Sequence, residues 1–313
     1  MHDDRGHLAF LFPGQGSQHR GMLGEAAEAF PAVRRVFERA SDALGYDLWA
    51  VISVDEGEQL NLTEFTQPAL LTASFALWTV WTEQGGERPA VMAGHSLGEL
   101  SAFCCAGAIA LEDAVRLVRE RGRAMQSAVP VGEGAMAAIL GLDDEQVIET
   151  CAALSDADSV VEAVNFNAPG QVVIAGHSDR VEKAIEALRE AGAKRAMPLP
   201  VSAPFHTSLM QPAADRLAEV LGAIDLQTPS IPVVHNVHAA VEEDVARIRS
   251  MLVQQVASPV RWTQCMATIG SMGVRRAVEC GPGKVLGGLL RRIDRSLECR
   301  YLEAPEALFA ALG

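Results

Sequence analysis

Ser96 stands between Gly94 and Gly98. The pattern Gly-x-Ser-x-Gly is typical of a nucleophile elbow, a strained turn between a strand and a helix that exposes a serine hydroxyl. The apolar run 90–93 predicts the strand, and residues 99–108 predict the helix. Backbone N–H groups at the start of such a helix can stabilise an oxyanion. We therefore predict that Ser96 is a catalytic nucleophile; the alternative is an ordinary Gly/Ser turn.

A serine nucleophile needs a general base, and histidine is the usual one. His206 lies in the loop 200–208, where a base could reach a site between two parts of the fold. A satisfied surface histidine or a helix-capping histidine is the alternative. His95 adjoins the serine, but neighbouring side chains on an elbow point apart, so His95 is a poor base for Ser96. The remaining rivals are His19, His177, His235 and His238.

One arginine lies on the apolar side of its predicted helix. At 100° per residue over 111–125, the apolar stripe contains Ala114, Leu117, Val118, Arg121 and Met125. The opposite side contains Arg116, Arg119, Glu120 and Arg123. A buried guanidinium needs a carboxylate or several acceptors, because burying an isolated charge is costly. Two interpretations stay open: a structural ion pair with an internal Asp or Glu, and bidentate capture of a substrate carboxylate.

A glycine-rich loop follows the first apolar run. Residues 8–12 predict a buried strand, and Pro-Gly-Gln-Gly-Ser-Gln at 13–18 predicts a tight loop at its end. Open α/β sheets place ligands at such strand ends. The loop lacks the phosphate-binding patterns GxxxxGK[ST] and GxGxxG. Gln15 is therefore either solvated in a plain turn or placed with its amide facing a reacting carbonyl.

Composition limits the function classes. The chain has 313 residues, 49% hydrophobic and 21% charged, which is typical of a globular protein. A net charge of −14 argues against general nucleic-acid binding, although a local basic patch remains compatible with it. We expect no membrane span, no secretory signal in 1–5 and no metal site. The six cysteines are expected to be reduced packing residues of a cytoplasmic protein.

The order of predicted elements indicates two subdomains. Residues 1–130 and 201–313 read as an α/β unit with helices at 26–45 and from Thr66 to about Gln84. Residues 131–200 follow the order β-α-β-β-α-β, which is the ferredoxin-like order. We therefore predict an α/β protein with a parallel sheet and an inserted ferredoxin-like subdomain.

The last third returns to α/β patterning. The apolar run 276–280 ends at Gly281-Pro282-Gly283 and leads into another predicted helix. That helix carries a basic cluster, formed by Lys284, Arg291, Arg292 and Arg295. The cluster is either a solvated helix face or a docking patch for an acidic protein.

Several motifs occur together and in order. They are Phe-Pro-Gly-Gln-Gly-Ser-Gln at 12–18, Gly-His-Ser-Leu-Gly-Glu at 94–99, Arg121-Gly122-x-x-Met125, Asn-Phe-Asn-x-Pro-Gly-Gln at 165–171, Ser202 to His206, and Glu279-x-Gly-Pro-Gly. With them the chain resembles the malonyl-CoA:acyl carrier protein transacylases of type II fatty acid synthesis over essentially its whole length. These enzymes are similar to the acyltransferase domains of polyketide synthases and have an α/β-hydrolase-like large subdomain.

The resemblance implies a Ser–His dyad. Ser96 would be the nucleophile and His206 the base, oriented by the backbone carbonyl of Gln255 instead of a carboxylate. The amides of Gln15 and Leu97 would form the oxyanion hole. Arg121 would bind the malonyl carboxylate, while the cleft would further be lined by His95, Met125, Asn165, Asn167 and Phe205. A bulky residue at Phe205 is the type that disfavours a 2-methyl branch.

The expected reaction is ping-pong transfer of malonyl from malonyl-CoA to the thiol of an acidic acyl carrier protein, without a cofactor, by a monomer. Two other functions compete with it. A serine esterase or thioesterase would place its histidine near the C-terminus, whereas His206 lies in mid-chain. A non-catalytic scaffold would not need Ser96, His206 and Arg121 together. The same chemistry could also serve a polyketide pathway in trans.

Overall fold

A computed structural model describes residues 8–55, 57–201 and 203–313. Residues 1–5, where no secretory signal is expected, and Ser202 of the loop before His206 lie outside the described residues. Within the described part of the chain, no helix is both long and apolar enough to cross a membrane.

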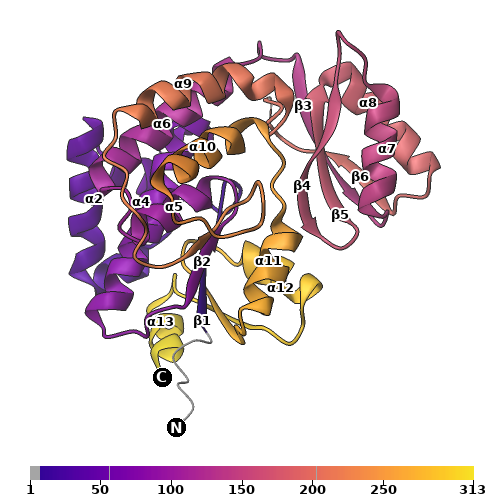
Figure 1. Cartoon of the computed structure of the whole chain (residues 1–313). Helices are drawn as coiled ribbons and strands as arrows, with labels where there is room; N and C mark the ends of the chain where they lie inside the picture. Colours follow the sequence, from indigo (N-terminus) through magenta and orange to yellow (C-terminus); the bar gives the residue numbers. More distant parts are fainter. Residues whose placement is uncertain (1–7, 56, 202) are drawn as a thin grey trace.

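A parallel sheet forms the centre of the larger body (Figure 1). Its strand order in the described residues is β7-β2-β1-β8-β9, and every neighbouring pair is parallel. The strands are β1 (Leu8–Phe12), β2 (Val91–Gly94), β7 (Val233–Val234), β8 (Arg276–Glu279) and β9 (Glu298–Tyr301). The predicted parallel sheet is confirmed, and its central strand is the first apolar run of the chain.

Strand β1 is buried on both faces. Leu8, Phe10 and Phe12 belong to one core cluster, whereas Ala9 and Leu11 belong to the other. This alternation explains why the strand is a continuous apolar run, as expected for a parallel sheet covered by helices on both sides.

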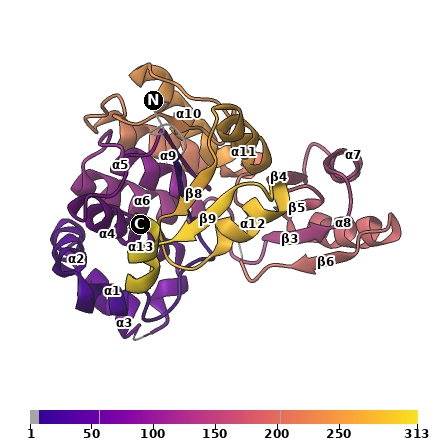
Figure 2. The same ribbon diagram turned by 90° about the horizontal axis from the view of Figure 1, so that it is seen from below.

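Helices cover both faces of the sheet (Figures 1 and 2). The first core cluster contains side chains from α2 (Pro31–Leu44), α4 (Thr63–Glu83), α5 (Leu97–Cys105), α6 (Leu111–Ser127), α9 (Gln211–Gly222) and α10 (Val245–Gln254). The second contains side chains from α11 (Trp262–Ser271) and α12 (Val285–Ile293). Several elements were not predicted from the sequence, namely α3 (Leu48–Ser53), α9, α11, β9 and α13 (Pro305–Leu312).

Two predicted helices differ from the structure at prolines. The pattern over 26–45 is interrupted, because α1 (Gly24–Ala29) ends at Ala29 and α2 begins at Pro31, with Phe30 between them. Phe30 is extended, at φ −130° and ψ 103°, as a residue before proline prefers. The helix predicted to open at Thr66 begins earlier, at Thr63, so Pro68 lies inside α4.

A second, antiparallel sheet stands beside the first, with its two helices on the side away from the larger body (Figure 1). Its strand order is β4-β5-β3-β6 in the described residues. The elements are β3 (Gly134–Leu140), α7 (Asp144–Leu154), β4 (Val161–Ala168), β5 (Gln171–His177), α8 (Ser178–Glu190) and β6 (Arg195–Pro198). The ferredoxin-like β-α-β-β-α-β order is therefore present, while subdomain boundaries at 131 and 200 stay a prediction.

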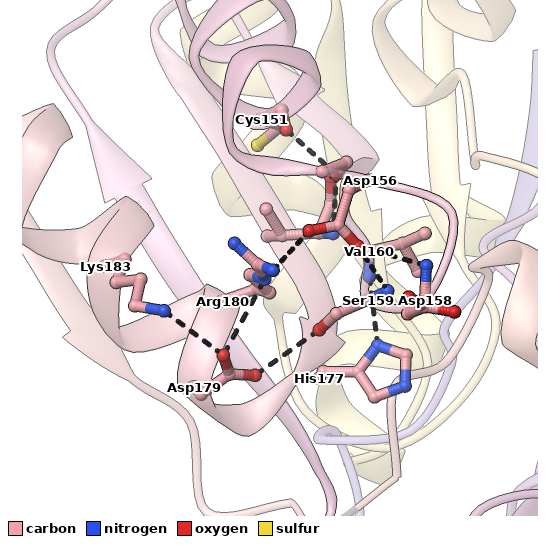
Figure 3. A network of polar contacts seen from close by, with 11 residues as sticks. Cys151, Asp156, Asp158, Ser159, Val160, His177, Asp179, Arg180 and Lys183 are labelled. Carbon is pink, nitrogen blue, oxygen red and sulfur yellow. Dashed lines mark hydrogen bonds and ion pairs between the residues drawn. The ribbon is translucent and has the colours of Figure 1, made fainter.

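Polar contacts hold the connection between α7 and β4 (Figure 3). Asp156 accepts from the backbone N–H of Asp158 and of Ser159 and pairs with Arg180 of α8. The Nδ1 of His177 accepts from the N–H of Val160 at 3.0 Å. These bonds hold the segment before β4 against α8 and the end of β5.

Candidate active site

The elbow at Ser96 is formed by the end of β2 and the start of α5. Ser96 has φ 53°, a left-handed value that is strained for a residue with a side chain. A Cβ on Gly94 would lie 1.9 Å from the carbonyl carbon of Gly98, and one on Gly98 would lie 2.0 Å from the carbonyl oxygen of Phe12. Only glycine fits at either position, so the two glycines allow the turn that holds the serine.

The serine hydroxyl and His206 form a hydrogen-bonded pair. Ser96 Oγ lies 2.7 Å from His206 Nε2, and His206 Nδ1 lies 2.9 Å from the backbone oxygen of Gln255. A carbonyl can only accept, so Nδ1 carries the proton and Nε2 accepts from the serine hydroxyl. His206 lies between β6 and the 3₁₀ turn Ser208–Met210, while Gln255 begins the 3₁₀ turn after α10. The arrangement is a nucleophile, a base and an orienting carbonyl.

Burial keeps His206 neutral. His206 is 3% exposed, and burial together with the nearby positive charge of Arg121 lowers the pKa of its imidazole to about 3. The carbonyl of Gln255 acts in the opposite direction, because it accepts a hydrogen bond from the ring. A neutral imidazole with a free lone pair toward Ser96 is the form that can accept the serine proton.

Arg121 points into the same site from α6. The residue is buried, at 2% exposure, as the helical periodicity predicts. Nη1 donates to Gln67 Oε1 at 2.9 Å, and Nη2 donates to Gln255 Oε1 at 2.9 Å and to Ser96 Oγ at 3.3 Å. No carboxylate of the described residues forms an ion pair with Arg121, so a structural ion pair does not account for its burial. Burial lowers the pKa of Arg121 to about 10, which leaves it charged at neutral pH.

The two backbone amides expected to bind the oxyanion lie close to Ser96. Gln15 lies in the loop after β1, and Leu97 is the first residue of α5; both border the pocket at Ser96. Among the described residues, neither backbone N–H donates a hydrogen bond. The Gln15 side chain is turned aside, with Nε2 at 3.4 Å from Thr63 Oγ1.

The pocket lies between the two sheets. It is lined by Gln15, Gln67, His95, Ser96, Leu97, Arg121, Met125, Met136, Asn165, Leu199, Val201, Phe205 and His206. Four of these, Gln67, Met136, Leu199 and Val201, were not predicted as site residues from the sequence; the others were. Met136 and Asn165 come from the small sheet, which therefore forms one wall. Asn167 does not line the pocket; its Oδ1 accepts from His95 Nε2 at 2.7 Å and so orients that ring.

A buried polar network supports the elbow, and sequence reasoning missed it. Asn236 Oδ1 accepts from the N–H of Ser96 at 2.8 Å, while its Nδ2 donates to Gly94 O at 2.7 Å. Glu99 accepts from His235 Nδ1, from the N–H of Asn236 and from Gln255 Nε2. Glu99 follows β2, and His235 and Asn236 follow β7, so each is at a strand end where functional residues are expected. Their contact with one another could not be predicted, because they are distant in sequence.

The four rival histidines all lie within the described residues, and none of them bonds Ser96. His19 pairs with Glu303, His177 bonds Val160, His235 bonds Glu99, and His238 is exposed. His206 is the histidine that contacts Ser96, in agreement with the choice made from the sequence.

The Glu279-x-Gly-Pro-Gly motif and the basic cluster lie outside the pocket lining. The buried carboxylate of Glu279 accepts from the N–H groups of Leu286 and Gly287 and so caps α12. A Cβ on Gly281 would lie 2.4 Å from Pro13 Cγ, so this glycine lets the chain pass the loop after β1. The basic cluster is exposed, and Arg292 reaches Gln171 Oε1 at 2.8 Å.

Comparison with known proteins places this site in a family. Residues 9–292 match the family model described as an acyl transferase domain. A malonyl CoA-acyl carrier protein transacylase of Salmonella typhimurium is 56% identical over 305 residues, covering 97% of this chain and 98% of that protein. A malonyl CoA-acyl carrier protein transacylase structure from Coxiella burnetii has 46% identity and a TM-score of 0.96, covering 98% of this chain and 97% of that one.

A second solved relative was captured with its partner. It is a malonyl-transacylase in complex with a type II PKS acyl-carrier protein, with 51% identity and a TM-score of 0.96. The match covers 98% of this chain and 99% of that chain. The chain belongs to the acyl transferase family, in the group of the malonyl-CoA:acyl carrier protein transacylases.

Proposed function

We propose that this protein transfers a malonyl group from malonyl-CoA to the pantetheine thiol of acyl carrier protein, supplying extender units for fatty acid synthesis. The observation that carries the proposal is that Ser96, His206 and a buried Arg121 meet in one pocket, and that no carboxylate of the described residues pairs with Arg121. A serine hydrolase needs the first two residues, whereas the arginine is accounted for by an acyl group with a terminal carboxylate.

In the first half-reaction, Ser96 Oγ attacks the thioester carbonyl while its proton passes to His206 Nε2. The oxyanion of the tetrahedral intermediate lies between the N–H groups of Gln15 and Leu97. Loss of one such donor typically costs about 10²–10³ in rate. Collapse breaks the C–S bond, the CoA thiolate takes the proton from His206, and a malonyl ester remains on Ser96.

In the second half-reaction, the carrier-protein thiol gives its proton to His206 and attacks the ester. Collapse breaks the C–O bond, and Ser96 Oγ recovers the proton from His206. This is ping-pong covalent catalysis. It needs no cofactor, because the thioester already supplies an activated acyl group.

Arg121 couples binding of the substrate carboxylate to the pKa of the base, His206. Its guanidinium binds the malonyl carboxylate and fixes the acyl group for attack. Its positive charge is also a cause of the lowered pKa of His206. A carboxylate bound to Arg121 opposes that charge, so the pKa of His206 rises toward its usual range and the imidazole becomes a stronger base when malonyl is present.

The pocket walls set the acyl size. Phe205, directly before the base, packs with Met136 and Val164 of the small sheet. A bulky ring there disfavours a 2-methyl branch, and one methyl group is worth about 1–3 kcal/mol of discrimination. We therefore propose preference for malonyl over methylmalonyl groups, with His95, Met125 and Asn165 completing the substrate contacts.

The carrier protein is proposed to dock on the exposed basic cluster of Lys284, Arg291, Arg292 and Arg295, because acyl carrier protein is acidic. Double charge reversal at Arg291 and Arg295 should raise KM for carrier protein and weaken its salt dependence, while leaving acyl-enzyme formation from malonyl-CoA intact. We further propose a monomer in the cytoplasm, where the free cysteines would remain reduced.

A polyketide carrier protein is the second candidate acceptor, since a 51% identical relative is seen with one. Purified protein should be offered a panel of acyl-CoAs with fatty acid and polyketide carrier proteins. The proposal expects malonyl transfer to carrier protein to outpace release of free malonate. Malonate release at an equal or greater rate would identify a thioesterase instead.

A further inference from the structure

Arg121 is held by neutral acceptors although a carboxylate lies close by. Its described partners are two carboxamide oxygens, from Gln67 and Gln255, and the hydroxyl of Ser96. Buried charges in proteins are ordinarily paired with opposite charges. Glu99 is fully buried in the same region, yet its carboxylate contacts the far end of the Gln255 side chain. The Gln255 carboxamide thus separates the two charges.

The hydrogen bonds determine which way each carboxamide points. Gln255 Nε2 donates to Ser96 O at 2.9 Å and to Glu99 Oε2 at 2.8 Å, and both of these atoms can only accept. The oxygen of Gln255 must then face Arg121. Gln67 likewise turns Oε1 to Arg121, while its Nε2 faces the sulfur of Met125 at 4.0 Å.

The guanidinium keeps donors for a ligand. An arginine has five N–H groups, and its described partners accept three hydrogen bonds from Arg121. Nε is buried and has no partner among the described residues. The positive charge of Arg121 and part of its hydrogen-bonding capacity are therefore available to a ligand in the pocket that contains Ser96.

We propose that Gln67 and Gln255 are specificity-determining residues, which position Arg121 through neutral oxygens and so reserve its charge for an acyl group that ends in a carboxylate. The inference rests on the proposed function and names what sets its substrate class. A glutamate in place of either residue would satisfy the same N–H groups but pair the guanidinium permanently, and a substrate carboxylate would then meet a neutralised site.

Gln67→Glu tests this with little change of shape. The new carboxylate keeps the acceptor for Arg121 Nη1 and sacrifices only the long N–H···S contact to Met125. Two like charges on either side of a guanidinium, about 6 Å apart, repel by roughly 2–3 kcal/mol at an effective dielectric of about 20. The ratio of kcat/KM for malonyl-CoA to that for acetyl-CoA should fall about 30- to 160-fold, at 1.36 kcal/mol for each factor of ten. Gln84→Glu, at the exposed end of the same helix, adds the same charge outside the pocket and should leave the ratio unchanged.

A binding measurement separates this inference from catalysis. In the Ser96→Ala background, calorimetry should show Gln67→Glu weakening malonyl-CoA binding more than acetyl-CoA binding. An unchanged or increased malonyl-to-acetyl ratio in both measurements would overturn the proposal. If Gln67→Glu does not fold, Gln67→Met removes the Nη1 acceptor without adding charge, and it should lower the same ratio by a smaller factor; no change would overturn the proposal. Failure of wild-type protein to form any malonyl-enzyme would instead refute the proposed function.

Discussion

Replacing Arg121 with alanine separates carboxylate binding from acyl transfer. Arg121 is 2% exposed, so a bond from its guanidinium to a malonyl carboxylate would be shielded from water. Truncating one partner of a buried, hydrogen-bonded charge pair costs about 2–5 kcal/mol. At 1.36 kcal/mol for each factor of ten, kcat/KM for malonyl-CoA should fall by roughly 30-fold to several thousandfold.

Acetyl-CoA provides the internal comparison. An acetyl group has no carboxylate and loses only the effect of the 3.3 Å contact between Arg121 Nη2 and Ser96 Oγ. Removing the positive charge also removes one cause of the depressed His206 pKa, so the acid limb of the acetyl profile should move to higher pH. The acetyl rate at neutral pH should therefore change by far less than the malonyl rate.

The assay is the initial rate of transfer to carrier protein with each acyl-CoA, over a range of pH. Arg123→Ala is the matched control, because Arg123 lies on the same helix but is exposed and pairs with Glu64 and Glu120. That variant should leave the malonyl-to-acetyl ratio unchanged. Equal losses for both substrates in Arg121→Ala would show that Arg121 serves the fold and not the substrate.

Three further predictions test the base, the elbow and the pocket wall. The pKa of His206 is lowered to about 3 in the folded chain, whereas its unfolded value is about 6.5. Between these two values only the unfolded state binds the proton, so the free energy of unfolding decreases as the pH is lowered. Urea unfolding should show wild type losing about 2 kcal/mol more than His206→Asn between pH 6.5 and 5; identical pH dependence would contradict this. Gly98→Ala should lower Tm strongly because its Cβ would lie 2.0 Å from a backbone oxygen, whereas Gly288→Ala, with no atom near its Cβ, should not. Phe205→Ala should raise kcat/KM for methylmalonyl-CoA relative to malonyl-CoA by about 10- to 200-fold, and an unchanged ratio would remove Phe205 from substrate selection.

The helix of Arg121 was predictable because α6 is amphipathic. Its buried positions recur with helical spacing, so one arginine on that side was conspicuous in the sequence. Gln67 could not be found in this way. Helix α4 is buried along most of its length, so its sequence has no separate apolar and polar sides. A polar residue such as Gln67 therefore does not stand out in the pattern. Contact with Arg121 depends on the packing of α4 against α6, which local patterns do not encode.

The network beneath the elbow shows a second limit. Glu99 and His235 are 136 residues apart and meet because β2 and β7 are neighbours in the sheet. Sequence spacing carries no record of that adjacency, and Asn236 was therefore not recognised as the residue that holds the Ser96 amide. Conversely, glycines at 94 and 98 were predictable, because the requirement they meet is local to the turn.

The intact mass of the protein after incubation with malonyl-CoA, followed by peptide mapping, tests the central claim most directly. Wild type should gain one malonyl group on the peptide that contains Ser96, and holo acyl carrier protein should remove it. Ser96→Ala should gain none, because its alanine has no hydroxyl to form the ester. A malonyl adduct of normal yield on Ser96→Ala, or transfer to carrier protein by that variant at the wild-type rate, would contradict the account.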